Sequence, residues 1–180
     1  MNKGMKNEES FETRIKGFTI RFAEEKDANE IFRMVKELAT YEKLLEGFEA
    51  TEDILRESLF HRGVAETLIA EYSRKPIGYA IFFQTFSSFL GRVAIYIEDI
   101  YVKPEMRGKN FGEALFAFIA DLAVKRKCGR LEWSCLDWNK PSIAFYEKMG
   151  AKRLNEWAMY RLSGDALERI ASSLQLGSLK

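Results

Sequence analysis

Two adjacent acids, Glu98 and Asp99, interrupt the apolar run from Val93 to Val102. A carboxylate among apolar neighbours needs a partner, or it keeps a raised pKa that suits it to accept a proton. Adjacent residues of a strand point to opposite faces, so we expect at most one of the two to face water. A purely structural role for these acids, at the edge of a sheet or at the centre of a hydrogen-bond network, explains their presence equally well. The pair marks a candidate proton acceptor.

A second candidate is the junction Arg107-Gly108-Lys109-Asn110-Phe111-Gly112, which opens an amphipathic helix. The first turn of a helix leaves backbone N–H groups free and carries the positive end of the helix dipole, which favours phosphate. The two glycines allow close approach, and the two basic residues add charge. The junction lacks the Gly-Lys-Ser/Thr of a Walker loop and the three glycines of a dinucleotide fingerprint. Glycines are also common at the start of a helix that binds no ligand, and this explanation fits the junction equally well.

A third segment runs from Asp137 to Gly150 (DWNKPSIAFYEKMG). Asn139 suits a helix N-cap, and Pro141 fits the first turn, where no intrahelical N–H is needed. Tyr146 follows Asn139 by seven residues, close to two turns, so both lie on one helix face. A phenol on that face is a candidate proton donor, although a packed aromatic is the commoner fate of a helical tyrosine.

The elements that position these segments follow from the periodicity of apolar residues. Early strands meet as hairpins, and later strands alternate with helices, which predicts a mixed α/β layer that is partly antiparallel and partly parallel. Residues 1–16 are expected to form a polar extension, and residues 17–180 a single domain. The expected strands are 18–22, 67–70, 77–83, 93–102, 131–136 and 156–162, and the expected helices are 27–38, 51–60, 108–127, 139–149 and 163–176.

Composition excludes several classes of function. Lys and Arg total 28 against 27 Asp and Glu, so we expect no bulk electrostatic binding to nucleic acid or to an anionic membrane. No apolar run reaches the length of a membrane span, and residues 1–10 lack the apolar core of a secretory signal. One histidine, His61, and two cysteines argue against a zinc site and against histidine catalysis. We expect His61 to end a helix, and the protein to lie in the reducing cytoplasm.

In this order and spacing, the three segments resemble the GNAT superfamily of acetyl-CoA-dependent N-acyltransferases, over roughly residues 18–162. The pattern Arg107-Gly108-x-x-x-Gly112 after Val102-Lys103-Pro104 is similar to the pyrophosphate-binding motif of that family, which usually has glycine where this chain has Asn110. Asn tolerates left-handed conformations better than most residues. The resemblance implies a mixed, mostly antiparallel sheet flanked by helices, with acetyl-CoA as acyl donor. The cofactor-binding residues it implies are Ile100, Tyr101, Val102, Arg107, Gly108, Lys109, Asn110, Phe111, Gly112, Asn139 and Ser142.

Three shorter segments resemble the spermidine/spermine (diamine) branch of the superfamily: Tyr41-Glu42, Ile97-Glu98-Asp99 and Asp137 to Ser142. This resemblance implies that Glu98 is the base, acting through water, and that Tyr146 protonates the leaving thiolate. The implied amine-binding residues are Tyr41, Glu42, Phe89 and Asp99. Phe89 stands where relatives have Trp, and the stretch Ser87-Ser88 replaces an acid of the same loop.

The sequence therefore predicts an N-acetyltransferase that acts on a small diamine-like or polyamine-like substrate by direct attack. Three alternatives stay open: acetylation of an amino acid, acetylation of a protein amine, and a non-catalytic domain that binds acyl-CoA. The resemblance also implies a homodimer, for which the apolar segment Trp157 to Leu162 and the terminal helix offer a surface. No metal is expected.

Overall fold

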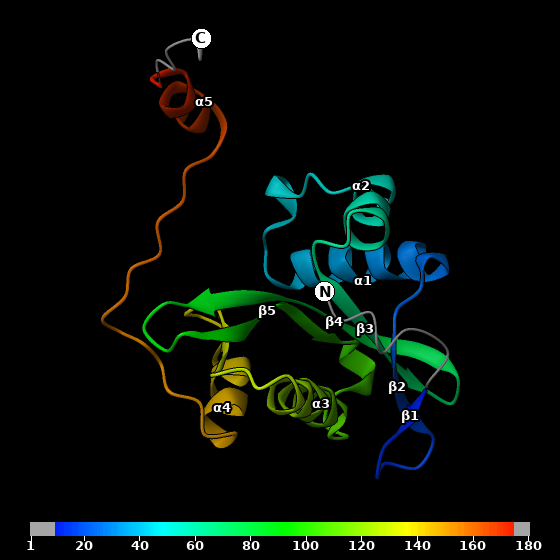
Figure 1. The fold of residues 1–180 in the computed structure, drawn as a ribbon. Coiled ribbons are helices and arrows are strands. Elements are labelled where there is room, and N and C mark those ends of the chain that lie inside the picture. Colours follow the sequence, from blue (N-terminus) through cyan, green and yellow to red (C-terminus); the bar gives the residue numbers. More distant parts are fainter. Residues whose placement is uncertain (1–9, 175–180) are drawn as a thin grey trace. The chain divides into compact units, whose positions relative to one another are not determined.

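The computed structural model describes residues 10–174, and its centre is a six-stranded sheet in the order β1-β2-β3-β4-β5-β6 (Figure 1). The first four pairings are antiparallel, and only β5 and β6 are parallel. The predicted mixed, mostly antiparallel α/β sheet is thus confirmed. The strands are β1 (Phe11–Glu12), β2 (Phe18–Phe22), β3 (Glu66–Tyr72), β4 (Lys75–Ser87), β5 (Arg92–Val102) and β6 (Leu131–Trp133).

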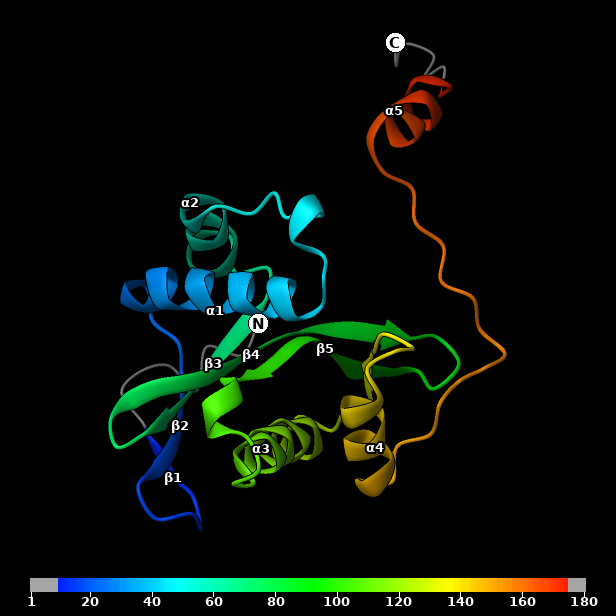
Figure 2. The same cartoon turned by 180° about the vertical axis from the view of Figure 1, so that it is seen from behind.

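Helices cover both faces of this sheet (Figures 1 and 2). On one face lie α1 (Ala28–Tyr41) and α2 (Glu52–Arg56), the latter continued by the π-helical turn η3 (Glu57–His61), and on the other lies α3 (Phe111–Lys125). His61 ends its helix, as the sequence predicts. Short 3-10 turns, η1 (Glu25–Asp27), η2 (Leu45–Gly47) and η4 (Pro104–Met106), join these elements. No helix within residues 10–174 is both long and apolar enough to cross a lipid bilayer.

The central strands bury side chains on both faces, because helices pack against each. Toward α1, the core cluster contains aliphatic residues and two tyrosines: Ile31, Met34, Ile69, Tyr79, Ile81 and Tyr101. Toward α3, the rings of Phe18 and Phe111 lie 4.6 Å apart, and Leu115 and Ile119 are fully buried. An acid on the α1 face of a central strand therefore sits against apolar neighbours.

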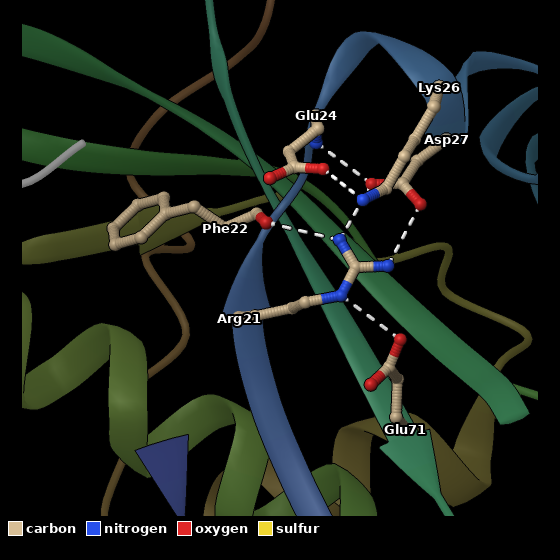
Figure 3. A network of polar contacts seen from close by, with 6 residues as sticks. All are labelled: Arg21, Phe22, Glu24, Lys26, Asp27 and Glu71. Carbon is tan, nitrogen blue, oxygen red and sulfur yellow. Dashed lines mark hydrogen bonds and ion pairs between the residues drawn. The ribbon is translucent and has the colours of Figure 1, made fainter. Parts of the chain in front are cut away.

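One guanidinium fixes the start of α1 to the sheet (Figure 3). Arg21 on β2 donates two hydrogen bonds to Asp27, at 2.7 and 2.8 Å, and a third to Glu71 on β3 at 3.0 Å. Asp27 also accepts from the backbone N–H of Glu24 at 2.8 Å. Burial opposes ionisation of Asp27, but these hydrogen bonds prevail and lower its pKa. The network holds the first turn of α1 against two strands.

The part of the N-terminal segment from residue 10 onward belongs to the sheet. Phe11 and Glu12 pair with β2, and the Phe11 ring lies 5.0 Å from that of Phe118 on α3. Within the polar extension predicted over residues 1–16, Phe11 and Glu12 are therefore part of the sheet, because an aromatic contact and a strand partner hold them. Residues 1–9 lie outside the described part of the chain.

The chain divides into two compact units, residues 1–136 and 137–180. The second contains α4 (Lys140–Lys148) and α5 (Gly164–Ser172), and residues 175 and 176 of the predicted terminal helix lie outside the described range. The strand predicted over 156–162 is wrong: this segment has no regular structure, and Trp157 and Tyr160 are 71% and 93% exposed. A strand needs a neighbour to accept its backbone hydrogen bonds, and the described residues of this unit contain none.

Candidate active site

A β-bulge in β5 places Glu98 and Asp99 on the same side of the sheet. Ile81 on β4 pairs with Asp99, but the next residue, Phe82, pairs with Ile97, so Glu98 is an extra residue in its strand. The expectation that only one of the two acids faces water assumed a regular strand. Because the bulge suspends the alternation of side chains, both carboxylates line one cavity.

Asp99 is largely buried, and its environment favours the protonated form. Burial, opposed by a hydrogen bond that lowers the pKa and reinforced by the negative charges of Glu98 and Glu42, raises the pKa of Asp99 to about 6. Burial also raises the pKa of Glu42, which follows the last residue of α1. The structure thus brings the predicted amine-binding acids Glu42 and Asp99 into electrostatic contact. None of the ion pairs within residues 10–174 involves Glu42, Glu98 or Asp99, so a cationic ligand suits this place.

The hydrogen bond to Asp99 comes from Tyr79, which sequence reasoning missed. Tyr79 is fully buried on β4, and its hydroxyl donates to Asp99 Oδ2 at 3.0 Å. Burial, together with the charge of Asp99, raises the pKa of Tyr79 well above its usual value, so the phenol keeps its proton. The two residues are 20 positions apart, and only the register of the β4–β5 hairpin makes them neighbours.

The parallel ladder between β5 and β6 ends beside the bulge. It pairs Ile95–Ile97 with Leu131–Trp133, and no strand within residues 10–174 pairs with β5 on this side beyond that point. Lys103 donates its N–H to Ile77, toward β4, so by alternation the N–H groups of Ile100 and Val102 point the other way. Backbone donors are therefore available one to four residues beyond the carboxylates, as an acyl carbonyl requires.

The loop that follows β5 has a backbone suited to an anionic ligand. Gly108 has φ +74°, with no atom within 4 Å of the position of an added Cβ, and Asn110 has φ +63° immediately before α3. Asn110 thus occupies the left-handed conformation in which glycine is the commonest residue. Lys109 is exposed beside it, and Phe111 and Gly112 form the first turn of α3, whose N–H groups lack intrahelical partners. These residues fit a pyrophosphate.

Arg107 connects this loop to the end of α1. Its Nε donates to the carbonyl of Val102 at 3.0 Å, and its Cζ lies 4.6 Å from the centroid of the Tyr41 ring and 5.8 Å from that of Tyr101. The hydroxyl of Tyr101 donates to Glu37 on α1 at 3.0 Å. Arg107, which is predicted to bind the cofactor, therefore contacts Tyr41, which is predicted to bind the amine. This contact connects the predicted cofactor-binding residues with the predicted amine-binding residues.

In the second unit, α4 has the local structure that the sequence predicts. The side chain of Asn139 caps the helix by accepting from the N–H of Ser142 at 3.4 Å, and Pro141 lies in the first turn. Tyr146 is half-buried, with its ring 5.2 Å from that of Phe145. Asn139, Ser142 and Tyr146 lie in a different unit from Glu98, and their roles stay predictions.

Phe89 is not brought to the carboxylates in this structure. It lies in the β4–β5 hairpin turn and is 93% exposed, whereas the cavity beside Glu98 and Asp99 is lined by other residues. Its expected place beside the amine rested on position in the sequence alone, and the long hairpin carries the turn away from the bulge.

The cavity has a volume of about 390 Å³ and lies between the sheet and the helices of the α1 face. Apolar residues from α1, α2 and the segment before β3 form most of its wall. Sequence reasoning missed them, because their periodicity is that of any helix packed on a sheet. With carboxylates at one edge and mostly apolar walls, the cavity is suited to an organic cation.

Comparison with known proteins agrees with this geometry. Residues 28–151 match the acetyltransferase (GNAT) family. Among solved structures, an integron cassette protein from the mobile metagenome of V. cholerae superimposes with a TM-score of 0.73 at 24% identity, over 86% of this chain and 98% of that protein. That likeness shows the fold.

Characterised relatives cover most of the chain. Thialysine N-epsilon-acetyltransferase of Sus scrofa is 37% identical over 164 residues, which cover 84% of this chain and 96% of that protein. L-ornithine N5-acetyltransferase of Arabidopsis thaliana is 31% identical, over 84% and 86% of the two chains. Spermidine/spermine N(1)-acetyltransferase-like protein 1 of Homo sapiens is 32% identical, over 83% of this chain and 23% of that protein. The family match, the fold and these relatives together establish that the chain belongs to the GNAT family of acetyltransferases.

Proposed function

We propose that this protein transfers the acetyl group of acetyl-CoA to the primary amine of a small cationic substrate by direct attack. The observation that carries the proposal is the bulge, which turns Glu98 and Asp99 to one side of β5 where its parallel ladder with β6 ends. The names of the relatives, which acetylate thialysine and ornithine, support a small amine as acceptor.

The proposed step uses residues on both sides of the bulge. A primary amine with a pKa near 10 is mostly protonated at neutral pH, so it must lose a proton before it attacks. Glu98 takes that proton, directly or through a water molecule. The amine nitrogen then forms a bond to the acetyl carbon while the carbon–sulfur bond breaks, and Tyr146 gives a proton to the departing thiolate. The acylated nitrogen loses its remaining extra proton to water, which leaves a neutral amide, and Tyr146 regains a proton from water.

Acetyl-CoA supplies the activated acyl group, and this chain supplies places for its parts. The N–H groups of Ile100 and Val102 support an acyl carbonyl that gains negative charge, and the loop from Arg107 to Gly112 supports the pyrophosphate. We also propose that Asn139 and Ser142 contribute to coenzyme A binding from α4, as the resemblance implies.

On the amine side, the acids Glu42 and Asp99 hold the cation and Tyr41 lies beside them, over Arg107. A diamine or polyamine needs a second place for positive charge, and Glu42 is the candidate for it. We further propose that the protein acts as a homodimer in the cytoplasm. The exposed apolar segment from Trp157 to Leu162 supports the first of these proposals, and a sequence with only two cysteines, too few for a disulfide scaffold, supports the second.

The test is thiol release from acetyl-CoA in the presence of primary amines. Glu98→Gln removes the base without changing the shape of the bulge, and we expect turnover to fall by about 10²–10⁴-fold. Glu12→Gln is the matched control, because Glu12 is an exposed acid on β1, at the opposite end of the sheet.

Two results contradict the proposal. Turnover of the Glu98→Gln variant at the wild-type rate removes Glu98 as the base. Binding of acetyl-CoA, measured by calorimetry, without thiol release from any amine indicates a domain that binds acyl-CoA and has no turnover.

A further inference from the structure

The wall of the cavity beside the carboxylates separates into an acidic edge and an apolar body. Glu98 and Asp99 form the acidic edge, on β5. The body is contributed by α1, α2, η3, the segment before β3, and β4. Its principal side chains are Val35, Leu55, Leu59, Val64, Ile81 and Phe83.

Polar groups are scarce on this body. Among residues 10–174, the only side chain with a hydrogen-bonding group that lines the cavity beyond the two acids is Ser58, and no Lys, Arg or His of this part of the chain lines it. A cation at Glu98 and Asp99 is favoured by charge, whereas a polar group further inside would lose water without gaining enough partners. Each methylene of an apolar group buried there increases affinity about fourfold.

Glu42, the third acid of the site, does not change the apolar character of the cavity wall. Glu42 is coupled electrostatically to Asp99 but does not line the cavity. A substrate that enters the cavity with its amine at Glu98 therefore meets a mostly apolar wall, and a second ammonium group on it reaches Glu42 only if that part of the substrate stays outside the cavity.

We propose that the cavity is a subsite for the apolar part of the acceptor, and that the preferred substrates are monoamines with an aromatic or branched alkyl group two or three carbons from the nitrogen. This inference rests on the proposed acetyl transfer and narrows its substrate class. The volume of about 390 Å³ lies within the range of small-molecule sites and accommodates a phenyl or branched butyl group.

The test compares kcat/KM for phenethylamine and isoamylamine with the values for ethylamine, putrescine and lysine, by thiol release from acetyl-CoA. We expect the two apolar amines to exceed ethylamine by at least tenfold, and to exceed putrescine and lysine, which each carry two ammonium groups, by more. Equal or higher values for putrescine or lysine overturn the inference.

A variant at the mouth of the cavity makes the test specific. Val64 lines the cavity and is 53% exposed, so Val64→Glu introduces a charge there without disrupting the core. We expect kcat/KM for phenethylamine to fall at least fivefold, kcat/KM for ethylamine to change less than twofold, and kcat/KM for putrescine to rise. Val124→Glu is the matched control, because Val124 is 76% exposed on α3, which covers the other face of the sheet. Equal effects of both variants on phenethylamine overturn the inference.

The two proposals fail differently. If no amine releases thiol, the acetyl transfer itself is refuted. If ethylamine, putrescine and lysine are acetylated and phenethylamine is no better than ethylamine, acetyl transfer stands and the apolar subsite is refuted.

Discussion

Asp99 combines a functional position with an unfavourable environment for a charge. Its side chain is held by the Tyr79 hydroxyl, surrounded by apolar neighbours and repelled by Glu98 and Glu42, and its pKa is about 6 instead of the usual 3.8. The folded state therefore binds the proton of Asp99 more tightly than the unfolded chain does. The stability that this bound proton gives the folded state is present below pH 3.8 and is lost as the pH rises to about 6. At neutral pH the ionised Asp99 carboxylate therefore destabilises the fold.

Asp99→Asn tests this opposition between stability and function. At pH 8 we expect the variant to be more stable than the wild type by roughly 1–3 kcal/mol, since a shift of one pKa unit corresponds to 1.36 kcal/mol. At pH 4.5 the gain should be small. Acetylation at pH 8 should fall at least tenfold in kcat/KM, because the amine loses its negative partner. Urea unfolding at the two pH values measures the first effect, with the exposed acid Glu49 changed to Gln as control. A loss of stability at pH 8 would contradict the argument.

Tyr79→Phe tests the hydrogen bond that supports the Asp99 carboxylate. Donation from Tyr79 lowers the pKa of Asp99, so its removal should raise that pKa further above its usual value. The acidic limb of kcat/KM against pH reports the free enzyme and should move to higher pH accordingly. Tyr72→Phe, which removes a hydroxyl from the end of β3, should leave the limb in place. An unchanged limb in Tyr79→Phe would show that Asp99 does not control amine binding.

At the scale of elements, the site depends on two interruptions of regular structure. The bulge in β5 brings adjacent acids to one side, and the left-handed Asn110 turns the chain from η4 into α3. The bulge is not held by local contacts. β4 fixes the bulge through pairings on both sides of Glu98, and the start of α1, which carries Tyr41 and Glu42 at its other end, is fixed by Arg21.

Arg21→Met tests how α1 is anchored. Methionine retains apolar contacts but leaves Asp27 nearly buried without its cationic partner, which we expect to destabilise the fold by roughly 2–3 kcal/mol at pH 7. The pKa of Asp27 is lowered in the fold, so the stability from this pair is present above pH 3.8 and lost as the pH falls. The deficit of the variant should shrink accordingly below pH 3.8.

The control for this prediction is Arg33→Met. Arg33 pairs with Glu30 on the exposed side of α1 at 3.4 Å, and such a surface pair contributes at most about 1 kcal/mol. Denaturant unfolding measures both variants. Equal losses of stability would show that the Arg21 network is no stronger than an exposed ion pair.

At the scale of the whole molecule, the sheet separates two kinds of surface. In the first unit, the α1 face contains the cavity and the acids, and the α3 face is packed with aromatic and aliphatic side chains. In the second unit, Trp157, Met159 and Tyr160 are each more than 70% exposed, although such side chains are usually covered. This exposure supports the proposed association of two chains.

Changing both Trp157 and Tyr160 to Ser tests that association. We expect the wild-type protein to have twice the 20.8 kDa mass of one chain by light scattering, and the double variant to shift to the single-chain mass at the same concentration. Val124→Ser, an equally exposed apolar position on α3, should leave the mass unchanged. A wild-type protein with the mass of one chain at every concentration would refute the dimer.

The sequence by itself determined the order and type of most elements, because periodicity, caps and turn residues act within a few positions. The cap by Asn139, the helix end at His61 and the left-handed Asn110 are local features of this kind. The sequence also singled out Glu98 and Asp99, since adjacent acids in an apolar strand are unfavourable without a reason.

Only the tertiary structure decided how those acids are used. The bulge, the bond from Tyr79 to Asp99 and the coupling to Glu42 depend on strand register and on the packing of α1, which join residues 15 or more positions apart. The same applies to one failure of interpretation: residues 156–162 form a mostly apolar run that suggests a strand, but the described residues of their unit contain no strand that could pair with it. Phe89 lies in the turn of a long hairpin, and its role beside the amine stays a prediction. Side-chain alternation and strand propensity are local, whereas pairing requires a partner, and the partner is set by the fold.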